Sequence, residues 1–293
     1  MRSPLSALAA LALLAAASLA QSACAAPPSG QLARSFSDAA GGKRSYYVAL
    51  PADYDAARKY RLVLVLAGTA TTGREMHEWF GEGWNPDTPG LERLMADTVF
   101  VYPDQRYSWD GDNGWALGPN AAPYDGWHDL RFIDELLTRV ESDYSIDTAR
   151  VFATGHSWGG DMTAVVGCYL GGRLRAIAPV AANRPFWFGS PPSAKDCTGQ
   201  PAVWTFFGLA DDHFGDSSPD GLFGIEQNDF WTKKLACSSD YDSAGETRSY
   251  RGCKAAVKLT LYAGGQYSGG GGLRGHQPPD YFLAAVSDWF SSL

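Results

Sequence analysis

Nearly continuous apolar runs alternate along the chain with segments in which apolar residues recur at helical spacing. The runs are typical of strands covered on both faces, and they lie at 60–66, 99–102, 151–153, 176–180, 202–207 and 257–262. The predicted helices lie at 91–97, 129–144, 161–168, 227–236 and 280–290. This alternation predicts a parallel sheet with helices on both faces. Near the beginning, residues 31–50 alternate about a Gly41-Gly42 turn, which predicts an antiparallel hairpin.

The length and composition fit one large domain of the α/β class. The chain has 293 residues, of which 45% are hydrophobic and 19% are charged. No internal repeat or low-complexity linker divides it, so residues 27–293 are predicted to form a single α/β domain. A net charge of −8 disfavours a nucleic acid or an anionic membrane as partner.

The first 26 residues have the pattern of a signal peptide. Arg2 supplies a positive charge, residues 5–20 are almost entirely Ala and Leu, and small residues precede Pro27. The apolar run is short for a membrane span. We therefore expect cleavage near residue 26 and secretion to the periplasm or the exterior. An alternative is lipid attachment at Cys24, although Gln21 stands where an aliphatic residue would be expected.

Four cysteines would remain in the mature chain, and an even number in an exported protein favours disulfides. They are Cys168, Cys197, Cys237 and Cys253. Three pairings are possible, of which Cys168 with Cys197 and Cys237 with Cys253 is the most local; buried free thiols are the alternative. No cysteine or histidine spacing indicates a zinc site, so no metal is expected.

A serine lies in the pattern Gly155-His-Ser157-Trp-Gly159, between the strand at 151–153 and the helix at 161–168. Strand, sharp turn and helix is the context in which G-x-S-x-G forms a nucleophile elbow, as in α/β-hydrolases. The glycines are required because the turn leaves no room for side chains beside the serine. Ser157 is therefore the candidate nucleophile. His156, whose side chain would point away from that of Ser157, is interpreted as structural.

A nucleophilic serine needs a base and a carboxylate that orients it, and in this fold they follow in the order Ser, Asp or Glu, His. His276 lies beyond the last predicted strand and is preferred as the base over His213. Asp211 follows the strand at 202–207 and is preferred as the acid, with the adjacent Asp212 as the alternative.

Acyl transfer also needs hydrogen-bond donors for the oxyanion. The backbone N–H of Trp158 is one candidate, and that of Thr69, in the loop after the strand at 60–66, is the second. Several aromatic residues lie in loops after strands, where a site of this fold opens. Among them Trp115 and Trp187 are predicted to contact substrate, although core packing would explain any single one.

The chain resembles the secreted feruloyl esterases and polyhydroxybutyrate depolymerase-like esterases of carbohydrate esterase family 1. The segments that carry the resemblance are 60–68, 101–104, 129–144, 150–160, 176–180 and 208–211. It implies an α/β-hydrolase fold, no cofactor, and a triad at Ser157, Asp211 and His276. It also implies disulfide bonding at the Cys197 and Cys237/Cys253 positions. Ala67-Gly68 departs from the family's usual His-Gly, and the glycine run before His276 is unusually long.

The leading hypothesis is a secreted serine carboxylesterase that hydrolyses feruloyl esters of plant cell-wall polysaccharides. Hydrolysis of a polyhydroxybutyrate-type polyester or of acetyl-xylan is the alternative within the same chemistry. A non-catalytic carbohydrate-binding protein on the same fold is an alternative of a different class.

Overall fold

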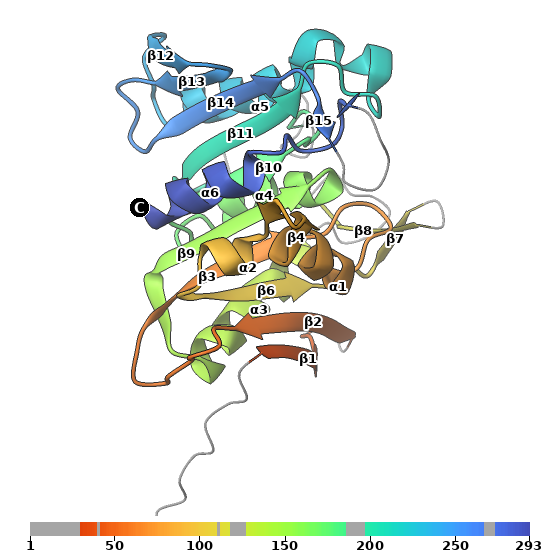
Figure 1. Cartoon of the computed structure of the whole chain (residues 1–293), viewed down its shortest axis with the longest axis vertical. Helices are drawn as coiled ribbons and strands as arrows, with labels where there is room; N and C mark the ends of the chain where they lie inside the picture. Colours follow the sequence, from red (N-terminus) through yellow and green to blue (C-terminus); the bar gives the residue numbers. More distant parts are fainter. Residues whose placement is uncertain (1–29, 40–41, 110–111, 118–126, 186–196, 267–272) are drawn as a thin grey trace, which may run out of the picture.

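A ten-stranded, mostly parallel sheet forms the centre of the molecule, with the strand order β1-β2-β6-β3-β9-β10-β11-β14-β13-β12 (Figure 1). The computed structural model describes residues 30–39, 42–109, 112–117, 127–185, 197–266 and 273–293. The predicted signal peptide and Trp187 lie outside these ranges. The strands from β6 to β14 in this order run parallel, whereas β1, β2, β12 and β13 pair antiparallel at the two edges.

The strands of this sheet are β1 (Gly30–Ser37), β2 (Lys43–Leu50), β3 (Tyr60–Leu66), β6 (Thr98–Pro103), β9 (Ile146–His156), β10 (Ala176–Val180), β11 (Ala202–Gly208), β12 (Tyr241–Ala244), β13 (Thr247–Tyr250) and β14 (Val257–Tyr262). Three small two-stranded sheets are formed by β4 (Gly83–Asn85) with β5 (Thr88–Pro89), β7 (Tyr107–Trp109) with β8 (Asp112–Gly114), and β15 (Gly265–Gln266) with β16 (Leu273–Arg274). The helices are α1 (Gly73–Met76), α2 (Leu91–Leu94), α3 (His128–Asp143), α4 (Trp158–Tyr169), α5 (Leu222–Lys234) and α6 (Phe282–Ser291), together with the π-helix η1 (His77–Gly81) and the short 3-10 helices η3 (Gly215–Ser217) and η4 (Pro219–Gly221).

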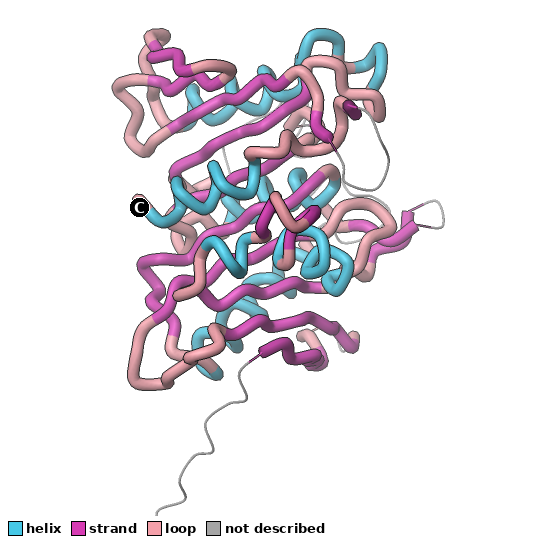
Figure 2. Tube along the Cα trace, viewed as in Figure 1, coloured by secondary structure: helices cyan, strands magenta, loops and turns pink. Residues whose placement is uncertain are grey.

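The two faces of the sheet have separate hydrophobic cores. On one face Leu62 and Leu64 of β3 pack with α3, α4 and α5, and on the other Val63 and Val65 pack with η1, α2 and α6. Side chains alternate between the faces of a strand, so a strand covered on both sides must be apolar throughout. This is the arrangement that the continuous apolar runs predict. Figure 2 shows helices on both sides of the magenta strands.

The structure contains the predicted strands and long helices. It differs from the prediction mainly in segments for which the sequence predicts no helix or strand. The segment between Cys237 and Cys253 contains the β12–β13 hairpin. β12 is exposed and β13 is half-buried, so neither has the continuous apolar run of a buried strand. The segment after β3 contains α1 and η1. β9 is longer than its apolar part, because residues 147–150 near its beginning are exposed or half-buried. No helix in the described part of the chain is long and apolar enough to span a membrane.

Two disulfides join neighbouring segments. Cys168, at the end of α4, pairs with Cys197, and Cys237, after α5, pairs with Cys253. This is the most local of the three possible pairings. The second disulfide closes the β12–β13 hairpin at its base.

Candidate active site

Ser157 lies in a sharp turn between β9 and α4. Its φ of 57° and ψ of −123° are rare for a residue with a side chain, and its N–H donates to the carbonyl of Val180 over 3.0 Å. A Cβ added to Gly155 or Gly159 would lie 2.6 Å or 2.0 Å from the Leu66 carbonyl oxygen. The turn therefore has the crowding that the G-x-S-x-G pattern predicts.

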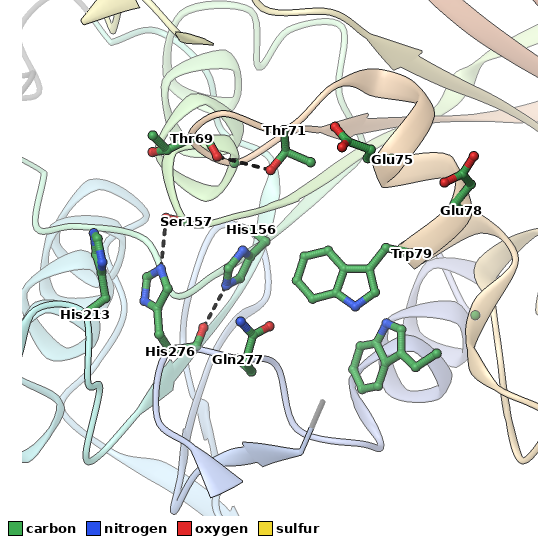
Figure 3. A pocket seen from close by; sticks show the side chains of 13 residues that line it. Thr69, Thr71, Glu75, Glu78, Trp79, His156, Ser157, His213, His276 and Gln277 are labelled. Atoms are coloured by element: carbon green, nitrogen blue, oxygen red, sulfur yellow. Dashed lines mark hydrogen bonds between the residues drawn. The ribbon is translucent and has the colours of Figure 1, made fainter. Parts of the chain in front are cut away.

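Ser157, His276 and Asp211 form a continuous chain of hydrogen-bonding distances. His276 Nε2 lies 2.9 Å from Ser157 Oγ, and His276 Nδ1 lies 2.8 Å from Asp211 Oδ2 (Figure 3). A carboxylate only accepts, so Asp211 selects the tautomer with the proton on Nδ1 and leaves Nε2 free to accept the serine proton. The three predicted residues thus come together from three loops, each of which follows a strand.

Asp211 is buried and is held by more than the imidazole. Its Oδ1 accepts the N–H groups of His213 and Phe214, each over 2.9 Å. Burial alone would raise the pKa of Asp211, but the hydrogen bond and charge of His276 together with these two N–H groups lower it below its ordinary value. Asp211 is therefore ionised over the range in which an imidazole can act as a base.

The two alternatives, Asp212 and His213, also lie at the site but in different positions. Asp212 Oδ1 accepts the backbone N–H of His276 over 3.0 Å, so it fixes the chain and not the ring. The ring of His213 lies beside that of His276, with centroids 4.6 Å apart. Burial and the neighbouring His276 lower the pKa of His213.

His156 contacts the backbone of His276 and does not take part in the hydrogen-bonded chain from Ser157 to Asp211. Its Nε2 lies 2.7 Å from the carbonyl oxygen of His276, as the dashed line in Figure 3 marks. Burial, followed by the proximity of His276, lowers the pKa of His156 to about 3, so the ring is neutral and donates from Nε2. This contact is consistent with the structural role predicted for His156, because it fixes the backbone of the His276 loop.

The two candidate oxyanion donors lie beside Ser157. Trp158 is the first residue of α4, so its N–H is at the positive end of that helix. Thr69 follows Gly68, and a Cβ on Gly68 would lie 3.5 Å from the Cβ of Ser157. The absence of a side chain at Gly68 allows this loop to approach the nucleophile (Figure 3).

A cleft of about 630 Å³ opens over Ser157, His276 and His213 and extends along α1 and η1. Glu75, Glu78 and Trp79 form its far wall, and Gln277 lies on the side of His276 (Figure 3). Trp84 also lines the cleft. Neither Trp79 nor Trp84 is among the substrate contacts predicted from the sequence. A sequence signal for this wall existed, since Thr72 and Glu75 form a capping box at the start of α1.

The structure corrects the role expected for Trp115. This residue is 0% exposed, and its Nε1 donates to the carbonyl oxygen of Ala67 over 2.8 Å. It therefore lies beneath the loop that bears Thr69 and does not line the cleft. Trp187, the other predicted substrate contact, lies outside the described residues.

The described residues contain no group of three or more His, Cys, Asp or Glu side chains arranged to hold a metal ion.

Comparisons with known proteins found relatives in sequence and in structure. No protein family model matches the chain. A probable feruloyl esterase C of Aspergillus clavatus is 26% identical over 258 residues, which cover 83% of this chain and 84% of that protein. A probable feruloyl esterase C of Aspergillus niger is 25% identical over 265 residues, with the same coverage.

Among solved structures, an acetyl xylan esterase from Aspergillus awamori superposes with a TM-score of 0.65 at 13% identity, covering 90% of this chain and 100% of that one. This likeness confirms the predicted α/β-hydrolase fold. The sequence relatives confirm the predicted resemblance to feruloyl esterases.

Proposed function

We propose that the chain is a secreted serine carboxylesterase that hydrolyses feruloyl esters of plant cell-wall polysaccharides. The observation that carries the proposal is the uninterrupted contact from Ser157 Oγ through the His276 ring to the Asp211 carboxylate, at the base of an open cleft. The similarity to feruloyl esterases C supplies the substrate class.

Ser157 Oγ attacks the ester carbonyl carbon while His276 Nε2 takes the hydroxyl proton. Asp211 orients the ring and stabilises the imidazolium that results. The carbonyl oxygen becomes an oxyanion held by the N–H groups of Thr69 and Trp158. When the tetrahedral intermediate collapses, the bond to the alcohol oxygen breaks and His276 returns the proton to that oxygen. Water then repeats the sequence on the acyl-enzyme and releases the acid.

The cleft favours an aromatic acid over acetate within this chemistry. An acetyl group needs only a small space beside the serine, whereas this cleft of about 630 Å³ continues past Trp79 to Trp84. The indole rings offer flat apolar surface, and Glu75, Glu78 and Gln277 offer hydrogen-bond partners for hydroxyl groups. A polyester or acetyl-xylan substrate stays the alternative.

The decisive experiment compares wild type with Ser157→Ala on methyl ferulate, p-nitrophenyl acetate and a polyhydroxybutyrate suspension. We expect wild type to hydrolyse methyl ferulate with the highest kcat/KM, and Ser157→Ala to lose about 10⁴-fold or more. Activity that survives in Ser157→Ala would overturn the nucleophile. Inactivity of wild type on all three substrates would favour the non-catalytic carbohydrate-binding alternative.

Secretion is part of the proposal and rests on two independent features. Residues 1–26 have the signal-peptide pattern, and the four cysteines of the remaining chain are all paired in disulfides. Mass spectrometry of the exported protein should place its N-terminus near Pro27. An exported protein that still begins at Met1 would contradict cleavage of the signal peptide.

A further inference from the structure

The loop between β3 and α1 is held from below by two buried side chains. Gln105 Nε2 donates to the Ala67 carbonyl oxygen over 2.7 Å and makes a second, short contact with the Gly68 carbonyl oxygen. Trp115 Nε1 donates to the Ala67 oxygen alone. Gln105 follows β6, the strand that pairs with β3, so the ends of two neighbouring strands are joined by these bonds.

The orientation of the Gln105 amide follows from its surroundings. Two carbonyl oxygens face the same end of the side chain, and an amide oxygen there would repel both of them, so that end must be the NH₂ group. Gln105 is only 8% exposed, so water cannot readily replace these bonds. Losing the donor would leave the Ala67 oxygen with Trp115 Nε1 and the Gly68 oxygen with the Thr71 N–H, a donor from the same loop.

Fixing the Gly68 carbonyl also fixes the Thr69 N–H. In a trans peptide the C=O and the following N–H lie in one plane and point in opposite directions. The Gly68 oxygen points to Gln105, so the Thr69 N–H points away from Gln105. Within the described residues this N–H donates to no acceptor.

We propose that Gln105 is the positioning residue of the oxyanion site: it holds the Gly68–Thr69 peptide so that the Thr69 N–H faces the oxygen of the reacting ester. This inference rests on the proposed function, because it requires Thr69 to act on a tetrahedral intermediate. The Thr71 N–H also donates to the Gly68 oxygen over 3.2 Å, but it belongs to the same loop and moves with it. Gln105 is the contact that ties this peptide to the sheet.

The test compares Gln105→Met with Gln227→Met. Methionine has nearly the length and volume of glutamine but no N–H donor. Gln227 is the matched control because it is also buried and its Nε2 donates to a backbone carbonyl oxygen, that of Asn183, over 2.6 Å. Both variants lose one buried donor, but only Gln105→Met releases the peptide before Thr69.

We expect Gln105→Met to lower kcat on methyl ferulate by about 10- to 100-fold with KM within about twofold, since direct loss of an oxyanion donor costs about 10²–10³. The inhibition constant of an aryl boronic acid, which forms a tetrahedral adduct on the serine, should rise by the same factor as kcat/KM falls. Gln227→Met should lose comparable thermal stability with kcat within about threefold.

Each possible outcome supports or overturns the proposal. A parallel loss of kcat and boronic acid affinity in Gln105→Met alone supports the proposal. Equal losses in both variants, or a rise in KM without a fall in kcat, would overturn it. An unchanged kcat in Gln105→Met would overturn it as well, while hydrolysis by wild type and its absence in Ser157→Ala would leave the proposed function standing. An inactive wild type, or an active Ser157→Ala, would instead refute the proposed function and this inference with it.

Discussion

Asp211 and Asp212 are neighbours in the chain, yet their carboxylates meet different parts of His276. Asp211 Oδ2 contacts the ring at Nδ1, whereas Asp212 Oδ1 accepts the backbone N–H. The sequence alone favours Asp211 only weakly, because both residues follow the same strand. The direction of each side chain in the turn after β11 separates them, and that direction is set by the N–H groups of His213 and Phe214, which both point to Asp211.

Replacing each aspartate by asparagine should separate their roles. Asp211→Asn presents an N–H to His276 Nδ1 and so favours the wrong tautomer; we expect kcat to fall by about 10⁴. Asp212→Asn keeps an oxygen that can accept the His276 N–H, and kcat should stay within about tenfold of wild type. Steady-state kinetics on methyl ferulate measure both. A larger loss of kcat in Asp212→Asn than in Asp211→Asn would show that Asp212, and not Asp211, is the acid of the triad.

The direction of the Trp115 side chain could not be predicted from the sequence. The prediction that it contacts substrate rested on its place in a loop after a strand, where the site of this fold opens. A tryptophan in such a loop can point into the cleft or beneath it, and the difference depends on which carbonyl its Nε1 meets. Here that partner is Ala67, and the ring is part of the core. Likewise, no pattern in the sequence connects Gln105 to a loop that lies 37 residues earlier.

At the scale of elements, the π-helix η1 carries Trp79 into the cleft and is anchored by a buried histidine. His77 Nδ1 lies 2.8 Å from Glu92 Oε1, which also accepts the Tyr102 hydroxyl over 2.6 Å, and His77 Nε2 lies 3.3 Å from Glu82 Oε1. Burial by itself would lower the pKa of His77, but Glu92 and Glu82 outweigh it and raise the pKa above its ordinary value.

This raised pKa makes the anchor depend on pH. The protonated ring is favoured in the folded state, so its contribution to stability is complete below the unfolded pKa of about 6.5 and is lost as pH rises through the folded pKa. The free energy of unfolding lost in His77→Gln should therefore be larger at about pH 6 than at about pH 8.5 in urea denaturation. Glu92→Gln, which keeps an acceptor for Tyr102 but removes the charge, should reduce that difference. A His77→Gln loss that is equal at both pH values would contradict this account.

Elements were predictable in proportion to how fully they are buried. The strands from β3 to β14 that form the middle of the sheet are apolar on both faces, so their signal does not depend on knowing the partner strand. In contrast, β12 is exposed and β13 is only half-buried, and only the pairing of β12 with β13 and of β13 with β14 makes them strands. The short α1 and η1 were missed because they hold too few residues for a periodic pattern to form.

The candidate site lies at the edge of the sheet where the parallel strands end, as the sheet topology requires. β3, β9 and β11 are parallel, so the loops after them, with Thr69, Ser157 and Asp211, meet at one edge, and the segment after β14 brings His276 to the same edge. Chain order alone was enough to predict this meeting. The shape of the cleft was not predictable, because its far wall comes from α1 and η1.

The Cys237–Cys253 disulfide lies towards the opposite edge. Cys253 precedes β14, at whose far end the chain turns towards His276, so this disulfide fastens the β12–β13 hairpin near the beginning of that strand. It spans a sequence separation of 16, and a loop of this size contributes about 3 kcal/mol by restricting the unfolded chain. Its effect should therefore appear in stability and not in turnover.

The variant Cys237→Ala/Cys253→Ala should unfold roughly 5–10 °C below wild type, with kcat on methyl ferulate at 25 °C within about twofold. Differential scanning calorimetry and steady-state kinetics measure the two quantities. Were kcat to fall strongly with an unchanged melting temperature, the hairpin would have to act on the site. One contact through which it could do so is that of Glu246, which follows β12 and accepts the hydroxyl of Tyr281, five residues after His276. A kcat within twofold would instead mean that the site edge of the sheet keeps its geometry without the second disulfide.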